Sequence, residues 1–146
     1  MDSLDDDIDI VWTAELTVGS PALDGHNRDM LGRLARAATI IDASDPAYLA
    51  DWLTECCEQL DALLLAEEDE LAAVGYPELA FHRRLHDRAR AITRDTRNQL
   101  ARVATPAALQ ALARASCTAM GLWLPRHVVD ADRLFFPYVD ERFRVM

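Results

Sequence analysis

The chain has 146 residues, of which 51% are hydrophobic and 7% aromatic, enough to bury an ordinary core in one domain. The net charge of -10 argues against nucleic acid and against anionic membrane surfaces as partners. No apolar run approaches the roughly 20 residues of a membrane span, and the sequence shows no charged-then-apolar secretory leader, so we expect a soluble cytoplasmic protein.

Start and stop signals divide the sequence into four long helical segments. An irregular N-terminal arm reaches to residue 22, and a first helix is expected over about 23–42. Ser44-Asp45-Pro46 predicts the start of a second helix over 46–74, which Gly75 ends. A third helix follows over 77–103 and a fourth over 106–134. This pattern predicts an all-α fold, an antiparallel up-and-down four-helix bundle that occupies residues 1–146 as a single domain.

The second predicted helix carries an acid on its apolar face. Its stripe advances in steps of three and four, so its members share the face that is buried, and they are Leu49, Leu53, Cys56, Leu60, Leu63, Glu67, Leu71 and Val74. A bare carboxylate at Glu67 would lose several kcal/mol to desolvation unless a cation meets it. Glu67 is therefore the first candidate for a functional residue.

Potential metal ligands lie on the inward stripes of all four predicted helices. They are His26 on the first, Glu67 on the second, His82 and His86 on the third, and His127 on the fourth, followed by Asp132. His82 and His86 are one turn apart and can bind one ion from one side. Each residue alone has an ordinary explanation, such as a core histidine or an acid paired with an arginine. Their convergence favours a metal site, and the mixture of carboxylates and imidazoles suits iron or manganese.

The pattern resembles the hemerythrin family, specifically the single-domain bacterial members, from Trp12 to about Asp132. Three segments carry the resemblance: Glu67-Glu68-Asp69-Glu70-Leu71 with Gly75-Tyr76-Pro77, the His82–His86 pair, and Trp123-Leu124-Pro125-Arg126-His127 with Asp132 five residues later. The opening, Leu23-Asp24-Gly25-His26, is about one residue shorter than the family's.

The resemblance implies two iron ions joined by a bridging oxygen species, with manganese as an alternative metal. Glu67 and Asp132 would bridge the ions. His82, His86 and His127 would complete one iron, and His26 would bind the second, where dioxygen attaches.

One ligand of the family is missing. The family has a histidine four residues before the bridging glutamate, and this chain has Leu63 there. By the resemblance, Leu63 would line a pocket beside the second iron. Glu70, one turn after Glu67, is the first of the weak candidates to replace it, although simple packing of Leu63 is the more economical explanation.

Three functions remain open at this point. The first is a diiron protein that binds dioxygen for storage, delivery or sensing. The second is a diiron oxidase or oxygenase that acts on a small molecule at the iron left open by Leu63. The third is a structural or regulatory protein with one metal or a metal other than iron. The expected partner is dioxygen or another small molecule.

Overall fold

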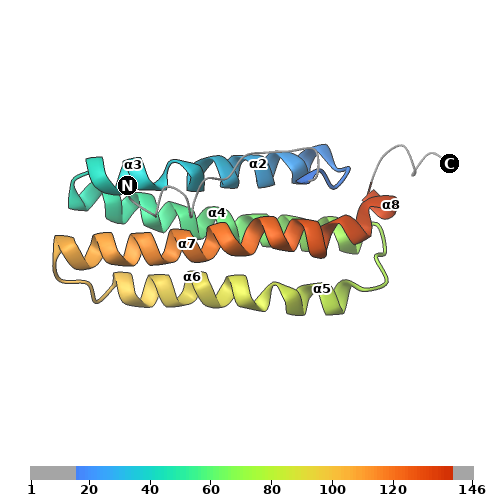
Figure 1. The fold of residues 1–146 in the computed structure, drawn as a ribbon. Coiled ribbons are helices and arrows are strands. Elements are labelled where there is room, and N and C mark those ends of the chain that lie inside the picture. Colours follow the sequence, from blue (N-terminus) through green and yellow to red (C-terminus); the bar gives the residue numbers. More distant parts are fainter. Residues whose placement is uncertain (1–15, 140–146) are drawn as a thin grey trace.

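The computed structural model describes residues 16–139, which form helices and turns without a strand. The helices lie lengthwise in rows (Figure 1): α2 (Pro21–Ala35) with α3 (Ala37–Ala43), then α4 (Pro46–Ala73), then α5 (Leu79–Leu85) with α6 (Asp87–Leu100), and finally α7 (Pro106–Asp130). A 3-10 turn, η2 (Asp132–Phe135), and the short α8 (Phe136–Val139) follow α7. The all-helical prediction is confirmed, and the alternating direction of successive rows is compatible with the expected up-and-down bundle.

Three of the helix starts follow the same local rule. Ser20, Asp45 and Thr105 each accept a hydrogen bond from the backbone N–H three residues later, and a proline stands in the first turn of each helix. The side-chain oxygen satisfies a backbone donor that the first turn leaves free, and proline has no donor to lose there. The cap at Ser20 starts α2 at Pro21, two residues before the predicted start. Residues 1–15 of the predicted irregular arm, including Trp12, lie outside the described residues.

Two of the predicted helices are interrupted. The first breaks at Arg36 between α2 and α3, and the third breaks at His86 between α5 and α6. Both residues keep dihedral angles near the helical region, with φ -90° and ψ -1° at Arg36 and φ -73° and ψ -15° at His86. The helix axis therefore continues past each break, and the fourth predicted helix instead ends four residues early, at Asp130.

The end of α4 is fixed by Gly75, which has the positive φ of +70° that favours glycine. The Tyr76 N–H donates to the Leu71 carbonyl at 3.0 Å, and the Gly75 N–H donates to the Ala72 carbonyl at 3.2 Å. This pair of bonds is a Schellman motif. It turns the chain sharply and carries Tyr76 back over the end of the helix rows.

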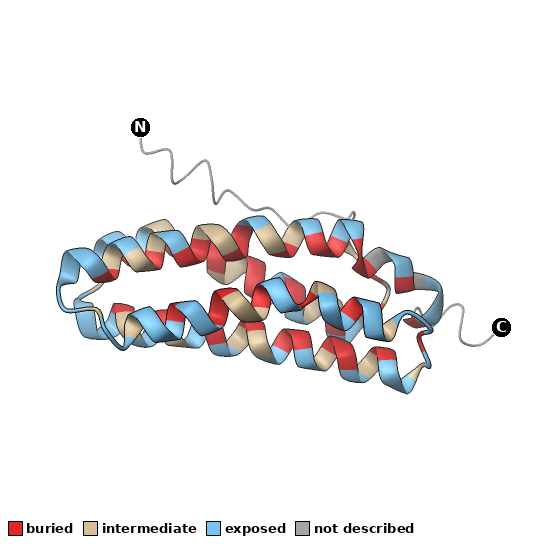
Figure 2. Cartoon of the chain, turned by 90° about the horizontal axis from the view of Figure 1, so that it is seen from below, coloured by how far each residue is buried: buried red, intermediate tan, exposed pale blue. Residues whose placement is uncertain are grey.

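Buried side chains line the inner faces of the rows, while the outer faces are exposed (Figure 2). The apolar core runs the length of the molecule and includes Leu34 and Ile41 of the first row, Leu53 and Leu60 of α4, and Met120 of α7. The three cysteines, Cys56, Cys57 and Cys117, are buried in this core as free thiols. Among the described helices, none combines the length and the apolar character needed to cross a membrane.

Candidate metal centre

Five side chains that are far apart in the sequence converge near the η2 end of the helix rows. Each offers one potential ligand atom, and these atoms all lie within 4.8 Å of one another. All five residues are buried, and they come from α4, α5, the α5–α6 junction, α7 and η2: Glu67, His82, His86, His127 and Asp132. We call this set the five-residue cluster.

Glu67 lies at the centre of the cluster. Its Oε1 atom is 2.5 Å from Nε2 of His82, 2.9 Å from Nε2 of His86 and 3.3 Å from Nε2 of His127. The side chain is 1% exposed. The acid on the apolar stripe is therefore buried against three imidazoles, and the predicted inward orientation of Glu67 is correct.

His86 is oriented by a second acid, Glu68. The Oε2 atom of Glu68 accepts a hydrogen bond from Nδ1 of His86 at 2.6 Å and also pairs with Arg90 at 2.8 Å. This contact fixes the orientation of the imidazole, so that Nε2 is the ring nitrogen that faces the cluster. Glu68 thus positions His86 without being one of the five residues.

The early end of α7 brings Asp132 to His127. Five residues along a continuous helix would place the two side chains about 140° apart around the axis. Instead the helix ends at Asp130, Ala131 takes φ -121° and ψ -50°, and the chain turns into η2. Oδ1 of Asp132 then lies 2.7 Å from Nε2 of His127 and 3.1 Å from Nε2 of His82.

Aromatic rings enclose the histidines. Trp123 stacks on His127 with ring centroids 4.3 Å apart, and Tyr76 and Phe135 meet the ring of His82 edge-on at 6.3 Å and 5.4 Å. Phe135 is fully buried. These rings keep water from the cluster and so strengthen the electrostatic interactions inside it.

The pKa values of the cluster follow from its burial and its mixture of charges. Burial raises the pKa of Glu67, but hydrogen bonds from His127, His82 and His86 outweigh it and hold that pKa well below its usual range. Burial lowers the pKa of His82 and of His127, yet the adjacent Asp132 and Glu67 carboxylates raise both to about 9. Burial and the nearby Glu67 raise the pKa of Asp132.

The donor set fits a divalent metal ion. Oδ1 of Asp132 is paired with the ring nitrogens of His127 and His82, at 2.7 Å and 3.1 Å. Its other carboxylate oxygen, Oδ2, is buried without a hydrogen-bond partner among the described residues, although buried carboxylate oxygens normally have one. A divalent cation among these atoms would satisfy that oxygen, and three imidazoles with two carboxylates suit iron or manganese.

Three other residues singled out from the sequence lie outside the cluster. His26 is exposed, so the expectation that it faces inward is wrong, and Glu70 is half-buried near the start of α2. Leu63 is 2% exposed and packs in the apolar core. The inward position on α2 belongs instead to Asn27, because the buried stripe runs Leu23, Asn27, Met30 and Leu34.

Sequence reasoning therefore missed Asn27 and Glu68. Asn27 follows the histidine directly, and a spacing of either three or four residues from Leu23 fits a helical stripe. Glu68 likewise directly follows the residue that was predicted to face inward, Glu67. The sequence carried no signal for the burial of Glu68, whose pairing with Arg90 is seen only in the structure.

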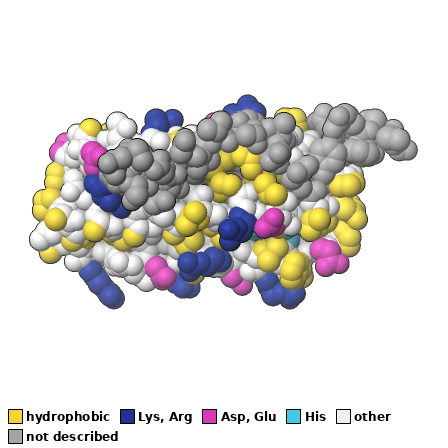
Figure 3. Space-filling model, in the orientation of Figure 1, with side chains coloured by type: hydrophobic (Ala, Val, Ile, Leu, Met, Phe, Trp, Pro, Cys, Tyr) yellow, Lys and Arg dark blue, Asp and Glu magenta, His cyan; other side chains and the backbone are white. Residues whose placement is uncertain are grey.

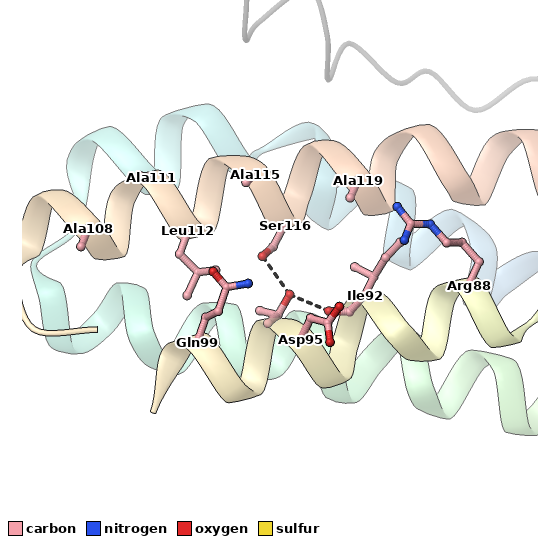
Figure 4. Close-up of a pocket in the computed structure, with 11 residues that line it drawn as sticks. Arg88, Ile92, Asp95, Gln99, Ala108, Ala111, Leu112, Ala115, Ser116 and Ala119 are labelled. Carbon is pink, nitrogen blue, oxygen red and sulfur yellow. Dashed lines mark hydrogen bonds between the residues drawn. The ribbon is translucent and has the colours of Figure 1, made fainter. Parts of the chain in front are cut away.

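Of two surface cavities, one reaches the centre and the other does not. The one in Figure 4 lies between α6 and α7, has a volume of about 440 Å³, and has none of the five residues in its lining. A smaller cavity of about 320 Å³ is lined by His127 itself, together with Phe81, Leu85, Trp123, Arg126, Asp130 and Ala131. Charged side chains are scattered among hydrophobic ones over the face shown in Figure 3.

Metal binding should release protons. His82 and His127 have pKa values of about 9, so at pH 7.5 both imidazoles of the metal-free protein carry two protons, one of which must leave each ring on coordination. We expect roughly two protons to be released per ion, and the affinity to rise with pH up to about 9. Calorimetry at pH 7.5 in buffers of different ionisation enthalpy measures this number. A heat that is independent of the buffer would contradict it.

Replacement of Glu68 should weaken metal binding although Glu68 is not a ligand. Glu68→Ala leaves Nδ1 of His86 without its acceptor, and we expect a loss of about 10- to 100-fold in affinity. Glu68→Gln keeps an acceptor oxygen and should lose less. His26→Ala is the matched control, because His26 is exposed, and it should bind metal as the unmodified protein does. Equal affinities for the Glu68→Ala and His26→Ala proteins would show that Glu68 does not orient His86.

Comparison with known proteins agrees with this geometry. A family model described as the hemerythrin HHE cation binding domain matches residues 18–139, a span that contains all five residues of the cluster. Neither the curated proteins nor the solved structures gave a match. Since the matched span covers most of the chain and its cation-binding character agrees with the buried cluster, the chain belongs to the hemerythrin family.

Proposed function

We propose that the protein binds iron at the five-residue cluster and binds dioxygen there, for storage, delivery or sensing. The observation that carries this proposal is the convergence of three imidazoles and two carboxylates in a buried position. The partner is a small molecule, in keeping with the negative charge of the chain, which disfavours nucleic acid and anionic membranes.

In the form that we propose, the centre takes two iron ions. His82, His86 and His127 would hold one ion on the α5–α7 side, while Glu67 and Asp132 would bridge it to the second. Carboxylates that project from facing helices hold pairs of ions in this way. When bound, reduced iron supplies electrons and a coordination position that dioxygen can occupy.

The chain's own residues would control how the centre meets dioxygen. Trp123, Phe135 and Tyr76 form an apolar enclosure that admits a small uncharged molecule and excludes bulk water. Glu68 contacts Nδ1 of His86 and so turns the other ring nitrogen, Nε2, toward the centre. The exclusion of water would favour reversible binding of dioxygen over autoxidation of the iron.

A second candidate function is oxidation of a small organic molecule. Leu63 leaves the second ion without an imidazole from α4, and open coordination positions favour reactivity. The cavity of about 320 Å³ beside His127 has apolar walls of Phe81, Leu85 and Trp123, and Arg126 lies at its edge. Its volume is within the range of small-molecule sites, so a compact, largely apolar substrate would fit.

Spectroscopy of the iron-loaded protein distinguishes these functions. We expect two irons per chain at saturating iron(II), and an absorption change on exposure to dioxygen that reverses when dioxygen is removed. Irreversible bleaching, with turnover of an added organic molecule, would support the oxidase instead. Absence of bound iron, or of any response to dioxygen, would overturn the proposed function, and one iron at saturation would overturn the two-iron form.

Leu63→His should strengthen binding of the second iron and slow autoxidation. The substitution adds an imidazole one turn before Glu67 on the same buried face, where it can complete the second ion. Iron content after extensive dialysis and the rate of spectral decay in air measure the two effects. Leu64→His, one position further around α4, is the matched control and should improve neither. If Leu63→His changes neither quantity, Leu63 does not lie at a metal position.

A further inference from the structure

Asn27 is a buried polar residue without a visible partner. Its side chain is 1% exposed, and neither its amide nitrogen nor its amide oxygen has a hydrogen-bond partner among the described residues. Buried amides nearly always bond to protein or to an ordered molecule. Among the described residues, the only other side chain with such a buried atom is Asp132 of the five-residue cluster, whose Oδ2 has no partner while its Oδ1 lies 2.7 Å from Nε2 of His127.

The register between α2 and α4 places Asn27 at the level of the cluster. Arg33 of α2 hydrogen bonds to Glu55 and to Gln59 of α4. The two helices run in opposite directions (Figure 1), so Asn27, six residues before Arg33, lies level with a point six residues after these partners. That point is within 61–65 of α4, which includes Leu63 and ends one half-turn before Glu67.

A second, independent register gives the same level. Gln110 of α7 hydrogen bonds to the Ile41 carbonyl, and Arg114 of α7 pairs with Asp42. We count the residues back from Ile41 and Asp42 to Asn27, and then the same numbers of residues forward along α7 from Gln110 and Arg114. This count reaches residues 124–129 of α7. This interval contains His127. Asn27 therefore lies on the interior face of α2, opposite both Leu63 and the cluster.

The chemistry on this side of the centre differs from that on the other. Three imidazoles approach from α5, the α5–α6 junction and α7. On the α2–α4 side, the residues at the cluster's level are an amide and a leucine. Oδ2 of Asp132 is without a partner, and carboxylates can bridge two ions. An amide oxygen and two carboxylates form an all-oxygen donor set, which hard cations such as manganese(II) accept.

We propose that Asn27 is a metal ligand, whose amide oxygen joins the carboxylates of Glu67 and Asp132 around a second ion on the α2 side of the centre. This inference rests on the proposed function and specifies the second of its two ions. The centre is then asymmetric, because one ion has three imidazole ligands and the other has none.

Charge adds to the asymmetry. One divalent ion neutralises the two buried acids, Glu67 and Asp132, while Glu68 is already paired with Arg90. A second divalent ion would bring two further positive charges into a site that offers only a neutral amide and an apolar leucine. Such excess charge is costly in a buried site unless a small anion enters with the ion. The second ion should therefore bind more weakly than the first.

Titration of the metal-free full-length protein with manganese(II) tests the proposal. We expect two steps, the second at least about tenfold weaker than the first. Asn27→Leu should abolish the second step and leave the first within about threefold, because the imidazole ligands are unchanged. Asn27→Asp, which adds a charged oxygen ligand, should tighten the second step. Met30→Leu, on the next turn of the same buried stripe, is the packing control and should preserve both steps.

Thermal unfolding of the metal-free protein supplies a readout that does not depend on metal. Asn27→Leu removes a buried amide without partners and replaces it by an apolar group of similar size, so its unfolding midpoint should exceed that of the unmodified protein. Any of four results would overturn the assignment of Asn27. Two concern the unmodified protein: a single step at saturating manganese(II), or two steps of equal affinity. The other two concern the variants: a second step that survives Asn27→Leu, or a second step that Asn27→Asp leaves unchanged. If the unmodified protein lacks even the first step, that result would instead count against the proposed function.

Discussion

The burial of the Glu67 carboxylate among three imidazoles is the constraint around which this molecule is built. An ionised acid that is 1% exposed would cost several kcal/mol without compensation. Its Oε1 atom lies within 3.3 Å of an imidazole nitrogen on each of His82, His86 and His127. Protonated histidines can supply the positive charge in the metal-free protein, and a divalent ion can supply it in the loaded protein. The same carboxylate thus serves the stability of the fold and the binding of metal.

The centre is formed where helices end or break. The Schellman motif at Gly75 returns the chain so that Tyr76 covers His82. His86 is at the break between α5 and α6, and the end of α7 at Asp130 lets Asp132 reach His127. Regular helices alone would align the ligands in stripes along the rows. The end of α7 instead brings Asp132 to the level where Glu67, His82, His86 and His127 meet across neighbouring helices, and aromatic side chains enclose the five residues there.

The sequence was sufficient for the helical class, for the inward face of α4 and for four of the five residues as members of helical stripes. Those predictions rest on periodicity, which is strong in long helices. Asp132 was predicted as a ligand, but within a helix that continued to residue 134, and only the η2 turn explains how it reaches the cluster. The prediction that His26 faces inward was wrong because the register of the first helix differs by one residue from the predicted one. A difference of one residue rotates a side chain by 100°, and the cap at Ser20 fixes a register in which Asn27 faces inward.

This change of one register position alters what the centre can do. With His26 outside and Leu63 inside, the α2–α4 side has no imidazole, so the two ion positions that we propose would differ both in donor type and in the charge around them. The ion with three nitrogen ligands would be retained more firmly than the one held by oxygen atoms. If dioxygen binds where coordination is incomplete, as we propose, the weaker position would also be the reactive one. The occupancy of that position would then decide between a carrier that releases dioxygen unchanged and an oxidase that consumes it, with Asn27 as the residue that sets the occupancy.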